Sequence, residues 1–360
     1  MIKLEKFHKL ISPFLKDDSV EFCQELMDQF VKSTRQHIIR VNTIASFIDR
    51  YYPYHDLSKF DSPFYYLLPY RHSEKKHEDI IKPDSMDEVN ERLGKATWKH
   101  ILTNAHHPEF WDNHLSLNMP FDRDNPKGDI DATEMIESAL DEYVCDCISM
   151  SIQVDNDLKA AHKWFDDNIS TRTGSRWIMS AEQIQYINEL ADKIIKILQD
   201  PDRKVFFDVD GVLRDIVGYF GTLDDNWDVK IDGKTIHEKI TEDFSVLADM
   251  PPMDCIDVVR DFAPTPFIMS SQQEPEAQKF TNLWLKKHFG AASGVYVTEG
   301  SCYTKDLLLK ENDRIFDDHP KFPESNKLII FSHGYNEHKQ GLRVNTPFEM
   351  EAALEVLKKW

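Results

Sequence analysis

The sequence predicts two domains of different fold class: an all-α domain over residues 1–200, and an α/β domain with a parallel sheet and a small helical cap over residues 201–360. The chain has 360 residues, more than one hydrophobic core usually serves. Apolar residues recur at helical spacing in the first part, whereas short apolar runs alternate with helical patterns in the second. Pro201 stops the last helix of the first part and marks the joint.

The first domain is predicted to consist of helices, because its apolar residues lie three and four positions apart. The main helices cover Val20–Ala45, Met86–His107, Ala132–Val154 and Ala181–Leu198. The second of these is expected to stop before Pro108, since proline has no backbone N–H to donate inside a helix.

The second domain is predicted to alternate strands with helices, the pattern of a parallel sheet covered by helices. The strands cover Val205–Val209, Pro266–Ser270, Gly294–Thr298, Arg314–Phe316 and Lys327–Phe331. The helices cover Met253–Phe262, Glu274–Phe289 and Thr346–Lys359. Residues from about 214 to 262, between the first two strands, are predicted to form the helical cap.

Composition narrows the possible partners. The net charge of −20 weighs against stable binding to nucleic acid, because phosphate backbones are held by Lys and Arg. Small phosphorylated substrates stay possible, since metal ions can neutralise their charge locally. The five cysteines are scattered and form no disulfide framework, and no apolar run is long enough to span a membrane. The start of the chain lacks a signal-peptide core, so a cytoplasmic protein is expected.

Two carboxylates follow the first predicted strand of the second domain. Lys204 to Phe207 form a short buried strand that delivers Asp208 and Asp210 before Gly211 breaks it. Residues two apart on an extended chain point the same way. Such a pair can hold a divalent cation, or divide nucleophile and proton transfer in phosphoryl transfer. The alternative is a surface turn, in which Asp and Gly are common.

Downstream residues favour the phosphoryl-transfer interpretation. Ser270 and Ser271 end a buried strand, Lys305 precedes a helical run, and Asp317 and Asp318 end another strand. The carboxyl ends of the strands of an open α/β sheet are where ligands bind. In this order, hydroxyls, an ammonium and paired acids indicate a site for a phosphoryl group and a cation.

This order of motifs resembles the haloacid dehalogenase superfamily over roughly residues 202–360, which implies a Rossmannoid α/β phosphatase fold. The resemblance implies that Asp208 is the nucleophile that forms an aspartyl-phosphate and that Asp210 is the general acid/base. It also implies that Ser270, Ser271 and Lys305 bind the phosphate. The expected Mg²⁺ ligands are a backbone carbonyl and Asp208, Asp210, Asp317 and Asp318.

Two stretches are most similar to 5′-nucleotidases of the deoxyribonucleotidase type: Asp208-Val209-Asp210-Gly211-Val212-Leu213 and Phe331-Ser332-His333-Gly334-Tyr335-Asn336. Ser270-Ser271-Gln272 departs from the Thr-Ser-Pro often found in that subfamily. The cap is where substrate choice would be made.

Histidines and acids of the first domain form a second candidate site. The set is His37, His55, Asp56, His100, His106, His107 and Asp146. His100 and His107 are seven residues apart, so they share a face if the helix persists. Asp146 lies in an apolar helix, where a carboxylate needs a partner or a metal. Any one histidine alone is better interpreted as a surface or core residue. The whole set favours Mn, Fe, Co, Ni or Zn.

This set resembles the HD superfamily of metal-dependent phosphohydrolases. His55-Asp56-Leu57-Ser58-Lys59-Phe60, with the segments around His100 and Asp146, is similar to an uncharacterised HD-like family of bacteria and their viruses, over roughly residues 30–190. The resemblance implies a helical domain with one or two metals, which lower the pKa of a water that attacks phosphorus. Lys59, one turn beyond Asp56, is the residue expected to contact a phosphate.

The sequence therefore predicts a bifunctional, metal-dependent phosphohydrolase that acts on nucleotides. One alternative is a single phosphatase with a regulatory metal- or nucleotide-binding domain. Another is a phosphatase that processes nucleic-acid ends, which the acidic composition disfavours. A third is an HD-type di-iron oxygenase.

Overall fold

The chain folds into two compact units. The structure is a computed structural model that describes residues 2–71, 77–118, 129–221, 230–298 and 301–360. The first unit comprises Met1–Val41 and Tyr52–Ile195, and the second comprises Asn42–Tyr51 and Lys196–Trp360. The second unit thus includes a segment from the first half of the chain, residues 42–51, which no sequence pattern predicts.

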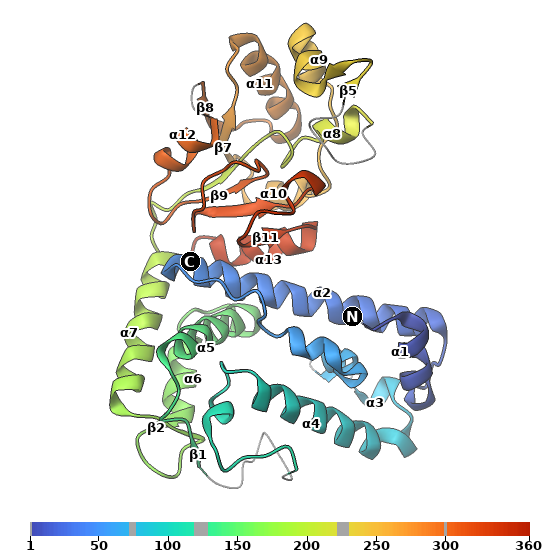
Figure 1. The fold of residues 1–360 in the computed structure, drawn as a ribbon, viewed down its shortest axis with the longest axis vertical. Helices are drawn as coiled ribbons and strands as arrows, with labels where there is room; N and C mark the ends of the chain where they lie inside the picture. Colours follow the sequence, from blue (N-terminus) through green and yellow to red (C-terminus); the bar gives the residue numbers. More distant parts are fainter. Residues whose placement is uncertain (1, 72–76, 119–128, 222–229, 299–300) are drawn as a thin grey trace. The chain divides into compact units, whose positions relative to one another are not determined.

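Helices dominate the first unit (Figure 1). The α-helices are α1 (Leu4–Ile11), α2 (Val20–Ala45), α3 (His77–Ile80), α4 (Met86–Thr103), α5 (Glu137–Met150), α6 (Ala160–Asn168) and α7 (Ala181–Leu198). The 3₁₀ turns that flank the candidate metal ligands are η3 (Leu57–Asp61), η4 (Pro63–Arg71) and η6 (Pro108–Trp111), and a π-helical turn, η7 (Ser151–Asp155), extends α5. α2 and α7 have the predicted bounds.

The prediction of an all-α first domain is wrong in one respect. Three two-residue strands, β1 (Ile130–Asp131), β2 (Ile169–Ser170) and β3 (Trp177–Ile178), form a small parallel sheet in the order β1-β3-β2. Strands this short bury too few alternating residues to stand out in a sequence pattern.

Two helices of the first unit are shorter than predicted, and side-chain hydrogen bonds explain both differences. α5 begins at Glu137 instead of Ala132, because Gln183 Nε2 donates to the carbonyls of Ala132, Thr133 and Met135 at 3.2, 3.1 and 2.8 Å. α4 ends at Thr103, where Asn104 Nδ2 donates to the His100 carbonyl at 2.6 Å and satisfies an acceptor at the helix end.

The second unit is built on a six-stranded sheet whose paired strands are all parallel. The strands are β4 (Val205–Phe207), β7 (Phe267–Ser271), β8 (Ser293–Val297), β9 (Arg314–Asp317), β10 (Leu328–Phe331) and β11 (Arg343–Val344). Their spatial order is β11-β10-β9-β4-β7-β8, which is 6-5-4-1-2-3 in chain order. This is a doubly wound order, and its direction reverses between β4 and β9, where such sheets bind ligands. The prediction of mixed helix and parallel sheet is confirmed.

Four helices accompany this sheet among the described residues: α10 (Ile256–Phe262), α11 (Pro275–Phe289), α12 (Ser301–Leu308) and α13 (Pro347–Leu357). α10 packs against α13, and α12 packs against β7 and β8. Lys305 lies within α12, so the prediction that it precedes the helix is wrong.

The segment predicted as a helical cap contains a hairpin as well as helices. After α8 (Ile216–Tyr219) come the antiparallel strands β5 (Lys230–Ile231) and β6 (Lys234–Thr235), then α9 (Ile236–Glu242) and η8 (Phe244–Ala248). Ile216, Ile236 and Leu247 form a buried cluster with Ala277, so the insertion shares a small core with α11. The last predicted part of the cap, α10, instead packs with α13.

Residues 42–51 are anchored within the second unit by a buried guanidinium. Arg314, at the start of β9, is fully buried and lies 3.8 Å from the ring centroid of Phe47. Its Nε donates to Ser46 Oγ at 3.0 Å.

No helix of the described part of the chain is long and apolar enough to cross a membrane.

Candidate metal and phosphate sites

All seven predicted histidines and acids of the first unit converge on one cluster. α2 carries His37, α4 carries His100 and α5 carries Asp146, while the other four lie in turns before η3 and η6. The cluster contains two groups, and within each group the ligand atoms all lie within 4.8 Å of one another. One group is Asp56, His100, His106 and His107, and the other is His37, His55 and Asp146. Either group could hold a metal ion.

Asp56 belongs to the first group and also faces the second. Its Oδ1 is 3.1 Å from His100 Nε2, and its Oδ2 is 3.4 Å from His37 Nε2. One carboxylate therefore faces a ligand group with each oxygen, as a bridging ligand does. Asp56 has a left-handed backbone, with φ +57°, a conformation that Asp tolerates better than most residues and that is concentrated at functional sites.

Lys59 forms an ion pair with Asp56. Its Nζ donates to Asp56 Oδ2 from one turn along η3. Burial raises the pKa of Asp56, but the Lys59 ammonium and the imidazoles outweigh burial and hold that pKa well below its usual range. Asp56 is thus an anion that attracts cations.

His100 and His107 meet by a different route from the predicted one. The helix does not persist to His107, because α4 ends at Thr103. A turn after Asn104 still brings His107 Nε2 within 3.0 Å of His100 Nε2. The expected proximity is present, although the expected helix is not.

Four of the histidines have a partner on the ring nitrogen that faces away from the cluster. His37 Nδ1 lies 3.3 Å from Ser149 Oγ, and His100 Nδ1 lies 2.6 Å from Ser58 Oγ. His55 Nδ1 and His106 Nδ1 lie 2.8 and 3.2 Å from the same oxygen, Oε1 of Glu142. Such outer partners orient metal-binding imidazoles and fix their tautomers.

Glu142 determines where two imidazole lone pairs point. A carboxylate oxygen only accepts, so neutral His55 and His106 carry their protons on Nδ1 and turn lone pairs inward from Nε2. His106 Nε2 is buried and has no hydrogen-bond partner among the described residues. These Nε2 lone pairs face the carboxylates of Asp56 and Asp146. Lone pairs and carboxylates repel each other unless a cation lies between them. This donor set therefore fits a metal ion.

Sequence reasoning missed Glu142. It lies four residues before Asp146, on the same face of α5, and that spacing is the signal that could have found it. Burial raises the pKa of Glu142, but hydrogen bonds from His106 and His55 outweigh burial and lower that pKa to about 2.

The second site lies at the carboxyl ends of β4 and β9. Lys305 Nζ donates to Asp208 Oδ2 at 2.5 Å and to Asp317 Oδ2 at 2.7 Å. Asp208, Asp317 and Asp318 have ligand atoms within 4.8 Å of one another. The predicted Asp208, Lys305, Asp317 and Asp318 are therefore brought together at the point where the strand order reverses.

The charges of this site fit a divalent cation. If all three buried carboxylates are ionised, they and the one buried ammonium carry two net negative charges, a repulsion that a cation would relieve. Burial, together with Asp317 and Asp208, raises the pKa of Asp318 well above its usual range, and burial also raises the pKa of Asp208. Carboxylate oxygens around a double negative charge are a donor set that suits Mg²⁺.

Gly211 lets Asp318 approach the loop that carries Asp208. Its φ is +80°, and a Cβ there would lie 2.0 Å from Asp318 Oδ2. Tyr335 donates its hydroxyl to Asp318 Oδ2, and Asn336 Nδ2 donates to the Asp318 carbonyl at 2.8 Å. Residues 335 and 336 thus contact a candidate metal ligand.

The carboxylate of Asp210 is held apart from these acids. Arg214 Nε donates to its Oδ1 at 2.8 Å, and Gln272 Nε2 donates to its Oδ2 at 2.6 Å. The three-carboxylate group does not include Asp210, so the structure does not bring its side chain in as a cation ligand. Ser270 and Ser271 are the last residues of β7, the neighbour of β4.

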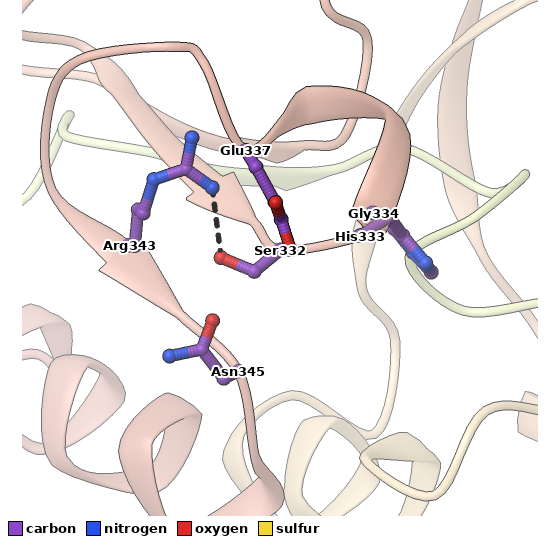
Figure 2. A pocket seen from close by; sticks show the side chains of 6 residues that line it. All are labelled: Ser332, His333, Gly334, Glu337, Arg343 and Asn345. Atoms are coloured by element: carbon purple, nitrogen blue, oxygen red, sulfur yellow. Dashed lines mark hydrogen bonds between the residues drawn. The ribbon is translucent and has the colours of Figure 1, made fainter. Parts of the chain in front are cut away.

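A pocket of about 390 Å³ lies where β10 and β11 end. Arg343 Nη1 donates to Ser332 Oγ at 3.0 Å, and Figure 2 shows the Ser332 hydroxyl between Arg343 and Asn345. His333 also lines the pocket, and its Nε2 donates to the Gly211 carbonyl at 2.6 Å. Through His333 the pocket adjoins the loop that carries Asp208 and Asp210.

Comparison with known proteins gives one match. Residues 27–199 match the model of a family of unknown function, DUF5662. That range contains every residue of the histidine cluster but none of the second site. No curated protein and no solved structure matches the chain.

Proposed function

We propose that this protein is a bifunctional, metal-dependent phosphohydrolase that acts on nucleotides. The observation that carries the proposal is the position of Lys305, buried between Asp208 and Asp317 at the reversal of a doubly wound sheet. This arrangement supports a phosphatase of the haloacid dehalogenase type in the second unit, for which we propose Mg²⁺ as the cofactor.

The proposed reaction in the second unit has two steps. Asp208 attacks the phosphorus of a phosphate monoester, the bond to the leaving oxygen breaks, and Asp210 gives that oxygen a proton. Water then attacks the aspartyl-phosphate and returns a proton to Asp210, so that inorganic phosphate leaves and Asp208 is restored. Lys305 neutralises charge on the phosphoryl group, and Ser270 would hydrogen-bond to it. Bound Mg²⁺, held by Asp208, Asp317 and Asp318, would offset the remaining negative charge.

We assign the nucleoside part of the substrate to the pocket at the ends of β10 and β11. Ser332, Asn345 and Glu337 offer hydrogen-bond donors and acceptors there, which suit a sugar and base better than an aliphatic group. The pocket adjoins the Asp208 loop through His333.

Phosphate release from a panel of nucleoside and deoxynucleoside 5′-monophosphates tests the phosphatase. Wild-type protein with Mg²⁺ should release phosphate, and Asp208→Asn should not. If p-nitrophenyl phosphate is hydrolysed but none of the nucleotides is, the phosphatase stands and the nucleotide substrate is wrong.

We propose a separate phosphohydrolase in the first unit, because Asp56 faces a metal-ligand group with each carboxylate oxygen. His37, His55 and Asp146 would hold one metal and His100, His106 and His107 another, with Asp56 shared. Mn, Fe, Co, Ni and Zn all suit imidazole and carboxylate ligands. A metal there would lower the pKa of a bound water for attack on phosphorus.

Metal analysis tests this second activity, together with nucleotide hydrolysis by paired variants. The double substitution His55→Ala/Asp56→Ala should remove bound transition metal and one phosphohydrolase activity, while chemistry that depends on Asp208 survives. Asp208→Asn should show the converse. A double variant that loses metal but no activity would make the first unit a binding module instead, and two bound irons with oxygen consumption would indicate an oxygenase.

A further inference from the structure

The carboxylate of Asp210 is clamped by three donors from two other residues. Oδ1 accepts from Nε and Nη2 of Arg214, and Oδ2 accepts from Nε2 of Gln272. Each oxygen thus has a partner that holds the side chain in one orientation, and Oδ2, with a single donor, keeps a second lone pair that can carry a proton. Asp208, two residues earlier, has wholly different partners.

The Arg214 half of the clamp is part of the core. Arg214 is fully buried, and its Nη1 donates to the Leu247 carbonyl in the insertion at 2.8 Å. Its Nη2 lies 3.2 Å from Thr281 Oγ1 on α11, and its guanidinium lies 5.7 Å from the ring centroid of Trp284. These contacts fix Arg214, so it cannot follow Asp210 if the carboxylate moves.

The Gln272 half is smaller and can be changed without opening the core. Gln272 follows β7 and is 6% exposed, and its backbone N–H donates to the Val297 carbonyl at 3.2 Å. Its own carbonyl accepts from Gln278 Nε2 at 2.8 Å. The backbone of Gln272 is therefore held independently of its side chain, whose amide is directed at Asp210.

We infer that Gln272 is a positioning residue that aligns the carboxylate of Asp210 with the leaving-group oxygen, an inference that rests on the phosphatase proposed above. Arg214 alone leaves the carboxylate able to turn about its Oδ1 contacts, and Gln272 fixes the second oxygen. The proton on Asp210 matters most when the leaving group is a poor one, such as an alkoxide. A p-nitrophenolate ion leaves without a proton. The contact between Gln272 and Asp210 should therefore raise kcat for alkyl phosphates and have little effect on kcat for p-nitrophenyl phosphate.

The test compares kcat of Gln272→Met on the two substrates. Met has a similar size and lacks the amide donor. We expect kcat to fall about tenfold for an alkyl phosphate and less than about twofold for p-nitrophenyl phosphate. Asp210→Asn should lower kcat for the alkyl phosphate further, because a general acid contributes about 100-fold or more. Gln278→Met, which removes a bond to the same segment without touching Asp210, should leave the ratio unchanged.

A double-mutant cycle separates positioning from a structural role. Adding Gln272→Met to Asp210→Asn should not lower kcat for the alkyl phosphate any further, because Gln272 acts through Asp210. Equal losses on both substrates, no loss on either, or additive losses in the cycle would each overturn the inference while the phosphatase stands. A wild-type protein inactive on both substrates would overturn the phosphatase and this inference together.

Discussion

Glu142 Oε1 lies 2.8 Å from His55 Nδ1 and is shared with His106 Nδ1, so one carboxylate sets the tautomer of two candidate metal ligands. We expect Glu142→Gln to lower the affinity for the bound transition metal by about 10- to 100-fold, because a neutral amide oxygen can still accept both N–H groups but lacks the negative charge that makes the two imidazoles stronger ligands. Competition against a chelator, with metal measured by mass spectrometry, gives the affinity.

Glu137→Gln is the matched control for this prediction, since Glu137 lies exposed in the first turn of the same helix. It should leave metal affinity unchanged. If Glu142→Gln binds metal as tightly as the wild type, the negative charge of Glu142 does not strengthen the two histidine ligands.

Lys305 supplies the only side-chain ammonium in contact with the Asp208–Asp317 pair among the described residues. Lys305→Met should lower the free energy of unfolding in metal-free buffer by about 3–5 kcal/mol, because it leaves buried carboxylates without their partner. Mg²⁺ should then stabilise the variant more than it stabilises the wild type. Chemical denaturation with EDTA and with Mg²⁺ measures both effects.

The exposed Lys310, just after the same helix, is the control, and Lys310→Met should change neither value much. Equal stabilisation of Lys305→Met and wild type by Mg²⁺ would show that the cation and the ammonium do not compensate the same charges.

Local patterns predicted much of this fold, and long-range contacts account for what they missed. The bounds of α2 and α7 follow from apolar spacing within each helix. The start of α5 depends on Gln183, which lies far along the chain and holds the carbonyls before it. Residues 42–51 belong to the second unit because Arg314 packs on Phe47, a contact that no local spacing encodes.

In the candidate sites too, local patterns predicted some residues and long-range contacts account for those that were missed. Residue type identified the seven histidines and acids of the first unit, and strand ends identified Asp208, Asp317 and Asp318. Glu142 was missed because glutamates are common on helix surfaces, so its spacing from Asp146 is a weak signal without the two histidines that lie beside it in space. The side chain of Asp210 points to Arg214 and Gln272 instead of the other acids, which alternation along a strand cannot specify.

Asn345 lines the pocket to which we assign the nucleoside. Asn345→Ala should raise KM for a nucleoside monophosphate about fivefold with kcat little changed, because one neutral hydrogen bond contributes about 1 kcal/mol. KM for p-nitrophenyl phosphate should stay the same. Asn312→Ala, at a residue bonded to Asp200 instead, is the control. A nucleotide KM that does not change would place the nucleoside elsewhere.

Gly211 combines a left-handed backbone with a close approach to Asp318. Gly211→Ala should reduce hydrolysis of p-nitrophenyl phosphate by about 100-fold, because the new Cβ forces the Asp318 carboxylate away and small misplacements at a reacting centre are costly.

Gly233 is the matched control. It has nearly the same φ, +82°, but nothing lies within 4 Å of a Cβ added there. Gly233→Ala therefore carries the same backbone strain without the clash, and it should keep most of the activity. If both variants lose activity equally, backbone strain is the cause and the contact with Asp318 is not. If Gly211→Ala remains active and binds Mg²⁺ like the wild type, Asp318 is not required at its observed position.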